Sequence, residues 1–477
     1  MLIPLSLITL SISLIIIASI FVGIYGYNYD IGRVVVILCL SISALICYGL
    51  NVRNISSIKG RILRPSLLLL FGICIIVFQN IIDLLLGNTD IDADVFGDRS
   101  LIMMGVAYGS MAMIAYIIGY ISTNTVSSKY RRDIEEPMPL KFLTILSIIL
   151  SLKFLSTIDA SFFTGQAYVE SGSILESHTN NSEVLLGICN TAILVQHAIN
   201  NRGNKMSFRE YLWRLPKIFL VLFFLYIILA LVRGTRFFAI RDLLLLVFSY
   251  VYCCRKQPIR NSIAIVLCVI MSFVLSIISF SRAFVTDDLS AKYSLSLEGF
   301  ENRKSFSPTT LELANSQFCD MVAINLFERR GEPHLCGVIQ LRYLAVIAMP
   351  NRILHKVWPV PVEKQGSAYF LTVKERGRNS DMGLGSTIYT DFYVDFGLVG
   401  MIICMIFVGF LFKKMDLILY SDISKSYTIF TIVLLIYVSA CAFYLSRSAL
   451  IPTIRMPLYA YILLKINALV CRDFNRL

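Results

Sequence analysis

The chain has 477 residues, of which 57% are hydrophobic, and its mean hydropathy is +0.73. This composition excludes an ordinary soluble globular protein, because too few polar residues remain to cover the surface of a chain of this size. The formal net charge of +12 does not indicate nucleic-acid binding, because the basic residues cluster in short loops between apolar runs, which is typical of membrane topology signals.

Apolar runs recur along the chain at roughly 17–23 residues, the length at which a helix crosses a bilayer. Lipid-exposed backbone must satisfy its own hydrogen bonds, and the runs lack the alternation of barrel strands, so helices are predicted. The fold class is therefore all-α, a polytopic integral membrane protein with about twelve transmembrane helices. The predicted helices cover residues 2–24, 34–50, 66–86, 101–121, 140–158, 183–199, 216–232, 237–253, 261–280, 396–412, 426–445 and 448–469.

The first apolar run, 2–24, lacks a basic segment before it and is predicted to be an uncleaved span rather than a signal peptide. The loops between the runs alternate in charge, and positive-inside reasoning places the basic set in the cytoplasm together with both termini. The basic set comprises Arg53, Lys59, Arg61, Arg64, Lys129, Arg131, Arg132, Arg202, Lys205, Arg209, Arg214, Arg255, Lys256, Arg260, Lys413 and Lys414.

One long segment interrupts the membrane helices, so three regions are predicted: a membrane domain 1–280 with helices 1–9, an extracytoplasmic loop 281–395, and a membrane domain 396–477 with helices 10–12. Inside the loop, Ser307-Pro308 resembles a helix start, and an amphipathic helix is predicted over 311–330. The apolar stretch 338–349 stops at Pro350 and is too short to span. It is predicted either to lie in the bilayer interface or to pack on the mouth of the helices.

Ionisable residues inside membrane helices are costly, and here they gather near the predicted external ends. The densest group is Arg233, Arg236 and Arg241, in the sequence RGTRFFAIRD. Guanidinium groups grip phosphate in bidentate fashion, so the cluster is a candidate phosphate site. The alternative is that these arginines snorkel to lipid headgroups.

Four further residues are candidates. Arg455 lies between Pro452 and Pro457, which suggests a broken helix lining a cavity, although a structural ion pair with Asp391 or Asp395 would also explain it. Asp391 and Asp395 are four residues apart and share a helix face, where they could act as a base or as counter-ions to the arginines. His355 is the loop histidine nearest to a plausible active site, whereas His178 and His334 stand in polar loop contexts; a lone loop histidine is usually solvated.

Metal and nucleotide chemistry receive no support from the sequence. The histidines are scattered, no cysteine pair has ligand spacing with histidine, and no phosphate-binding glycine loop appears, so no cofactor is predicted. Two cysteines, Cys319 and Cys336, fall in the external loop, where an oxidising compartment would permit a disulfide; the alternative is two buried free thiols.

These features resemble the bacterial O-antigen or oligosaccharide repeat-unit polymerases of the Wzy family. The resemblance covers the topology of the whole chain, including one long external loop late in the sequence. It is most specific over 342–400, and the RGTR segment resembles the arginine-rich external turn of the family. The residues that carry it are Pro350-Asn351-Arg352, Trp358-Pro359, Lys364, Gly385-Ser386 and Asp395-Phe396-Gly397-Leu398-Val399-Gly400.

The resemblance implies a metal-independent glycosyltransferase of lipopolysaccharide biosynthesis in the bacterial inner membrane. Its substrates would be oligosaccharides linked to undecaprenyl pyrophosphate, joined on the periplasmic face. A chain-length regulator and a flippase of the same pathway are implied partners, and nucleic acid is not. His355, Asp391 and Asp395 would be catalytic, and Arg233, Arg236, Arg241, Arg352 and Arg455 would bind the pyrophosphate and glycan. The alternatives are an O-antigen ligase, which uses the same donor, and a lipid-linked oligosaccharide flippase, which the long loop and one-sided charges disfavour.

Overall fold

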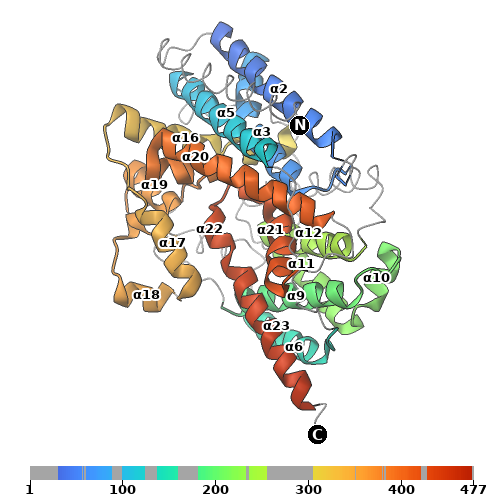
Figure 1. Cartoon of the computed structure of the whole chain (residues 1–477). Helices are drawn as coiled ribbons and strands as arrows, with labels where there is room; N and C mark the ends of the chain where they lie inside the picture. The colour runs from blue at the N-terminus through green and yellow to red at the C-terminus, as the bar shows by residue number, and fades with distance from the viewer. Residues whose placement is uncertain are drawn as a thin grey trace, which may run out of the picture. The chain divides into compact units, whose positions relative to one another are not determined.

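A computed structural model defines the fold. It describes residues 31–55, 57–58, 61–88, 99–123, 137–158, 181–232, 236–254, 305–349, 351–378, 380, 383–420 and 427–474. Every regular element in these ranges is a helix, as predicted (Figure 1). The predicted spans 2–24 and 261–280 and the acidic stretch at residues 90–98 lie outside the described residues.

The chain forms two compact units. Unit 1 comprises Met1–Val126, Arg303–Ile418 and Ala442–Pro452, and unit 2 comprises Ser127–Asn302, Leu419–Cys441 and Thr453–Leu477. These units differ from the predicted regions 1–280, 281–395 and 396–477. The units are defined by compactness, whereas the predicted regions are defined by membrane topology.

Unit 1 contains three long apolar helices from the first part of the chain: α2 (Ile31–Arg53), α3 (Pro65–Leu85) and α5 (Arg99–Ser122). Helix α3 starts where the sequence dictates, because Pro65 occupies the first helical turn and Arg64 before it is extended. Helix α5 packs on both α2 and α3, and its side chains are buried on nearly all sides, as its all-round apolar sequence requires (Figure 1).

The predicted loop helix over 311–330 is wrong as a single element. The structure has short pieces instead: a 3₁₀ turn η1 (Pro308–Thr310), α15 (Leu311–Ala314), α16 (Gln317–Ile324) and a π-helical turn η2 (Asn325–Arg329). Ser307 precedes the first of them, but its side chain makes no capping hydrogen bond. Downstream lie α17 (Val338–Ala348), α18 (Asn351–Val357), η3 (Val362–Lys364) and α19 (Ser367–Arg376).

Helix α20 (Ile388–Leu419) returns the chain to an apolar span. It begins at Ile388 rather than at the predicted residue 396, so Asp391 and Asp395 belong to its first turns. At Gly397 the backbone leaves helical conformation with φ 69°, a value that L side chains rarely adopt, and the helix is kinked there.

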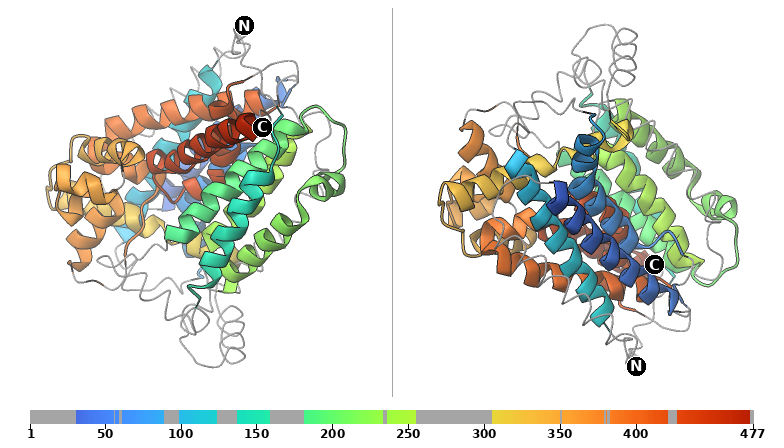
Figure 2. Two further views of the ribbon diagram at one scale, coloured as in Figure 1. Left: turned by 90° about the horizontal axis from the view of Figure 1, so that it is seen from below. Right: turned by 90° about the horizontal axis from the view of Figure 1, so that it is seen from above.

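Unit 2 is built around α9 (Asn181–Asn200), against which α6 (Lys141–Leu155), α12 (Arg236–Cys253) and α23 (Arg455–Phe474) pack (Figure 2). The short α10 (Phe208–Arg214) starts at a capping box made by Ser207 and Glu210. It is bent by 110° from α11 (Lys217–Val232), which packs on α6 and α12. Helix α21 (Ile429–Leu445) runs from unit 2 into unit 1, and α22 (Leu450–Thr453) precedes α23.

The described residues include six helices long and apolar enough to cross a membrane, or seven if α10 and α11 count as one broken span. They are Ile31–Arg53, Pro65–Leu85, Ser100–Ser122, Ser182–Asn200, Ile388–Leu419 and Leu450–Cys471. A multi-pass membrane protein is the class that this set supports. Helices α6 and α21 are shorter, at 15 and 17 residues, and α12 carries three charged residues, so their predicted crossings stay predictions.

Candidate functional site

In unit 2, two of the helices that carry the predicted arginines meet at one glycine. A Cβ atom added to Gly187 of α9 would lie 3.1 Å from Nη2 of Arg241 in α12 and 3.1 Å from Cε of Met456 in α23. Arg455 is the residue before Met456 and the first residue of α23, and Arg236 is the first residue of α12. The absence of a side chain at Gly187 therefore lets the arginine-bearing ends of α12 and α23 approach the same part of α9.

Arg241 is not an exposed cation. Its side chain is 3% exposed and its Nε donates to Oδ1 of the adjacent Asp242 at 2.6 Å, while Asp242 is fully buried. Asn190 of α9 approaches the other carboxylate oxygen at 3.5 Å. Among the described residues, Nη2 of Arg241 has no hydrogen-bond partner. Burying an ion pair is costly unless its donors and acceptors are satisfied, so this nitrogen is an unusual feature of the unit 2 interior.

Arg455 differs from Arg241 in its exposure. It is half-buried, and its guanidinium carbon lies 5.5 Å above the centre of the Tyr459 ring, one helical turn further along α23. A cation held over an aromatic face keeps most of its donors available. Arg233 lies outside the described residues, and for Arg236 the structure describes the backbone alone.

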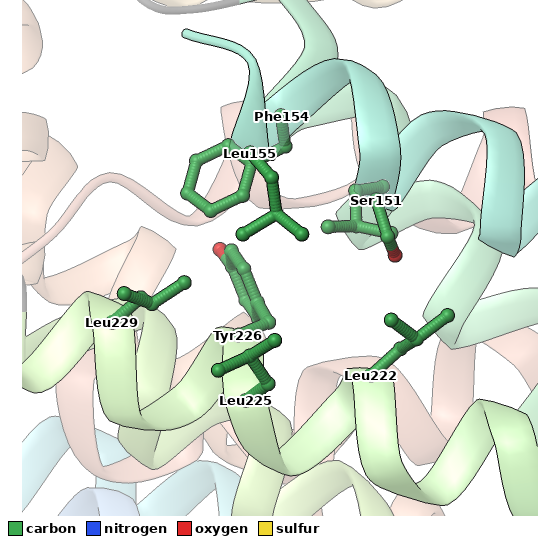
Figure 3. A pocket seen from close by; sticks show the side chains of 8 residues that line it. Ser151, Phe154, Leu155, Leu222, Leu225, Tyr226 and Leu229 are labelled. Atoms are coloured by element: carbon green, nitrogen blue, oxygen red, sulfur yellow. The ribbon is translucent and has the colours of Figure 1, made fainter. Parts of the chain in front are cut away.

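A small apolar pocket lies beside this region, between α6, α9 and α11. Figure 3 shows Phe154 and Leu155 of α6 facing Tyr226 and Leu229 of α11 across it. The hydroxyl of Tyr226 donates to Glu183 of α9 at 3.4 Å, so one wall of the apolar pocket continues into the polar interior of unit 2.

Asp391 and Asp395 lie in unit 1, where both are fully buried. Asp391 accepts hydrogen bonds from Gln340 Nε2 at 2.8 Å, from the Tyr343 hydroxyl at 3.2 Å and from the Ser367 hydroxyl at 2.5 Å. It thus joins α17 and α19 to α20. The burial of Tyr343 and the neighbouring carboxylate raise the pKa of that phenol, which therefore acts as a donor at neutral pH.

Asp395 caps a helix. Its two carboxylate oxygens accept the backbone N–H groups of Ile339 at 3.3 Å and Gln340 at 2.8 Å, at the N-terminus of α17. A carboxylate in this position satisfies orphan amides and complements the helix dipole. Within unit 1 the two aspartates therefore bond to polar groups of the loop helices, and the structure supports a positioning role for both.

His355 and Arg352 both belong to α18. The imidazole of His355 is exposed, which agrees with the solvated alternative, and for Arg352 the structure describes the backbone alone.

His334 is more enclosed than its polar sequence context indicates. Its ring stacks on Phe327 with 4.3 Å between ring centroids and meets the edge of Tyr393 at 5.3 Å. Nε2 would lie 3.1 Å from a Cβ placed on Gly397, so the ring sits in the space that the kink of α20 leaves open. This histidine packs against the kink.

Asp320 of α16 is a buried carboxylate that the sequence analysis missed. The hydroxyls of Thr387, Tyr389 and Thr390 at the start of α20 all donate to it, Thr387 at 2.7 Å. Burial raises the pKa of the Asp320 carboxyl from its ordinary 3.8 to about 7, and these hydroxyls oppose the rise. No local signal marked it, because in a regular helix Asp320 would lie on the face opposite Phe318 and Val322.

The cysteines of the loop are both free in this structure, so the possible Cys319–Cys336 disulfide is not formed. Cys319 is buried beside Asp320, and burial raises the pKa of its thiol to about 12, whereas Cys336 is exposed. Among the residues that the structure describes, no group of three or more His, Cys, Asp or Glu side chains could hold a metal ion.

No protein-family model, no curated protein and no solved structure matches this chain. The class of protein therefore rests on the apolar helices, and the functional argument rests on the residues themselves.

Proposed function

We propose that the chain is an O-antigen or related surface-polysaccharide polymerase, a glycosyltransferase that joins oligosaccharide repeat units carried on undecaprenyl pyrophosphate at the external face of the bacterial inner membrane. The observation that carries this proposal is the approach of α12 and α23 to Gly187, which supports a cluster of Arg236, Arg241 and Arg455 at one end of unit 2.

The chemistry explains why arginines matter. An acceptor hydroxyl attacks the anomeric carbon of the donor, a carbon–oxygen bond forms, and the bond from that carbon to the pyrophosphate oxygen breaks. The proton of the hydroxyl passes to a base, and the pyrophosphate leaves with its electron pair. The developing charge is on the leaving group, so fixed guanidinium donors supply the main stabilisation.

The proposed roles follow from exposure. Arg455, whose side chain is half-buried, contacts the pyrophosphate directly. Arg233, Arg236 and Arg352 keep the binding role that the resemblance implies. Arg241 is buried and supports the cluster from behind through its pair with Asp242. Asp391 and Asp395 hold the loop helices in place, which leaves His355, whose side chain is exposed, as the candidate base.

The test compares Arg455 with a matched cation on the same helix. Lys465 also lies over an aromatic ring, that of Tyr461, at 5.5 Å. Arg455→Ala should abolish the lipopolysaccharide ladder and Arg455→Lys should shorten it, because lysine lacks the bidentate fork, while Lys465→Ala should leave it unchanged. Membrane levels of each variant are measured in parallel.

Three outcomes would redirect the proposal. If Ala variants at Arg233, Arg236 and Arg455 all reach normal levels and still give full ladders, the pyrophosphate site is elsewhere. If loss of the protein leaves polymer on the lipid carrier without attachment to the lipid A core, the chain is a ligase. Repeat units trapped on the cytoplasmic leaflet would instead indicate a flippase.

A further inference from the structure

Helices α17 and α18 expose apolar side chains that no described part of unit 1 covers. In α17, Leu341 and Leu344 are 58% and 52% exposed, and they lie three residues apart on one face. In α18, Ile353 and Val357 are 52% and 70% exposed and lie four residues apart. The opposite face of α17 is occupied, because Ile339, Gln340 and Arg342 are buried.

This surface continues an apolar stripe on α20. Phe396, Val399, Ile403 and Phe407 are 42–70% exposed and follow helical spacing along the span. A lone helix face of this kind on a membrane span faces lipid. A Cβ on Gly337, immediately before α17, would lie 3.1 Å from Phe396, so α17 starts beside the first residue of the stripe.

The kink at Gly397 marks the position along α20 beside which α17 begins. The apolar turns of α20 between Gly397 and Lys413, residues 398–412, extend about 22 Å at the helical rise, enough to cover most of a hydrocarbon core. The segment before Gly397 holds the buried Asp391 and Asp395. Because Asp395 caps the start of α17, that start is held next to the kink. A span that ends near Gly397 would put it at the boundary between hydrocarbon and headgroups.

The chemistry of α18 fits the same boundary. His355 and Lys356 are exposed beside Ile353 and Val357, and Trp358 follows directly. Tryptophan is enriched at membrane interfaces, and basic side chains next to apolar ones are typical of helices that lie in the plane of an anionic bilayer. Arg342 ties the two helices together, since its Nη1 approaches the Trp358 carbonyl oxygen at 3.5 Å.

We propose that α17 and α18 form an interfacial lipid-binding surface, with Leu341, Leu344, Ile353 and Val357 inserted among the upper acyl chains and Lys356 among anionic phospholipid headgroups. This surface is independent of the proposed transferase activity. It would anchor the loop to the bilayer beside α20.

The chain offers a direct probe, because it has two tryptophans, Trp213 and Trp358. The full-length W213F variant is reconstituted into vesicles of phosphatidylethanolamine and phosphatidylglycerol whose acyl chains carry bromine either near the headgroup or near the methyl end. Trp358 emission should be quenched most by bromine near the headgroup. In the W213F/W358F background, L341W should behave in the same way.

The matched control is R376W in the same background. Arg376 is exposed at the end of α19 but lies among polar residues, so a tryptophan there should escape quenching. Lys356→Glu should reduce Trp358 quenching in phosphatidylglycerol vesicles more than in phosphatidylcholine vesicles, if the headgroup contact is electrostatic.

The proposal is overturned if neither Trp358 nor L341W responds to brominated lipid. Acrylamide then separates the two remaining explanations: accessible tryptophans would show that the face is in water, and inaccessible ones that protein covers it. Equal effects of Lys356→Glu in both lipids would overturn the headgroup part.

Discussion

Arg241 and Asp242, neighbours in the sequence, form an ion pair inside unit 2, with 2.6 Å between Nε and Oδ1 and side chains 3% and 0% exposed. The pair stands one turn from the start of α12, at the point where the arginine cluster of the proposed site begins. Mutations can therefore separate the contribution of this ion pair to stability from its role in the proposed site.

Asp242→Ala should destabilise the protein by about 3–5 kcal/mol, because it leaves the Arg241 guanidinium buried without a counter-ion. A double variant, R241M/D242L, should recover most of the loss, since an apolar pair of similar volume removes both charges. Thermal melting of the detergent-solubilised protein measures both. The control is Arg378→Ala, which removes the exposed partner of Glu363 and should cost at most about 1 kcal/mol. An unchanged melting temperature for Asp242→Ala would contradict the buried pair.

Helices α5 and α20 approach each other through two glycines. A Cβ on Gly119 would lie 1.8 Å from the Ile406 carbonyl oxygen, and one on Gly409 would lie 1.9 Å from that of Tyr116. Gly119→Ala should therefore destabilise unit 1 by about 1–3 kcal/mol, because the two backbones must separate. Gly49→Ala in α2 is the matched control: nothing lies within 4 Å of its Cβ, and the change should stabilise by about 0.5–1 kcal/mol. Similar melting temperatures for the two variants would show that the close approach is absent.

The cap on α17 predicts a local effect. Asp395→Ala should release the N-terminus of α17 at a cost of about 0.5–2 kcal/mol, because the Ile339 and Gln340 amides lose their acceptor. Limited proteolysis of reconstituted protein should then cut sooner between α16 and α18. Glu332→Ala, which removes a half-buried partner of Lys374, should leave the cleavage rate unchanged. Equal rates for both variants would rule out the capping role.

Asp320 predicts a pH dependence of stability. The folded-state pKa, about 7, is above the ordinary 3.8, so the folded protein binds this proton more tightly than the unfolded chain does. Stability from this group is therefore complete below about pH 4 and is lost as pH rises to about 7, by up to about 1.4 kcal/mol per pH unit. Asp320→Asn cannot titrate, so its melting temperature should fall less across that range. Parallel curves for the two proteins would refute the prediction.

Hydropathy was sufficient to predict most helices because lipid imposes one length and one composition on every span. The prediction of 66–86 for α3 differs from the observed Pro65–Leu85 by one residue at each end. The start of α20 was harder to predict, because in the sequence Asp391 and Asp395 are typical of the end of a loop rather than of a membrane helix. Their burial depends on Gln340, Tyr343 and Ser367, which are distant in sequence, so no local pattern could reveal it.

The candidate site was predictable in its residue types and less so in its exposure. The RGTRFFAIRD segment indicated clustered arginines, but it could not show that Arg241 would pair with its own neighbour in the interior of unit 2. The side chain of Arg241 can be buried there because Gly187, in α9, is small enough to leave room for the guanidinium group. The position of a glycine in an apolar run does not indicate which side chain will pack against it.

The kink at Gly397 has a mechanical consequence. A continuous helix transmits a twist or tilt along its whole length, as a rod does. Because the backbone leaves helical conformation at Gly397, the turns that hold Asp391 and Asp395 form a separate lever from the apolar turns that follow. The ring of His334 packs beside Gly397, between these two parts of α20. We therefore expect a movement of the loop helices to bend α20 at this joint rather than to tilt the apolar turns that follow.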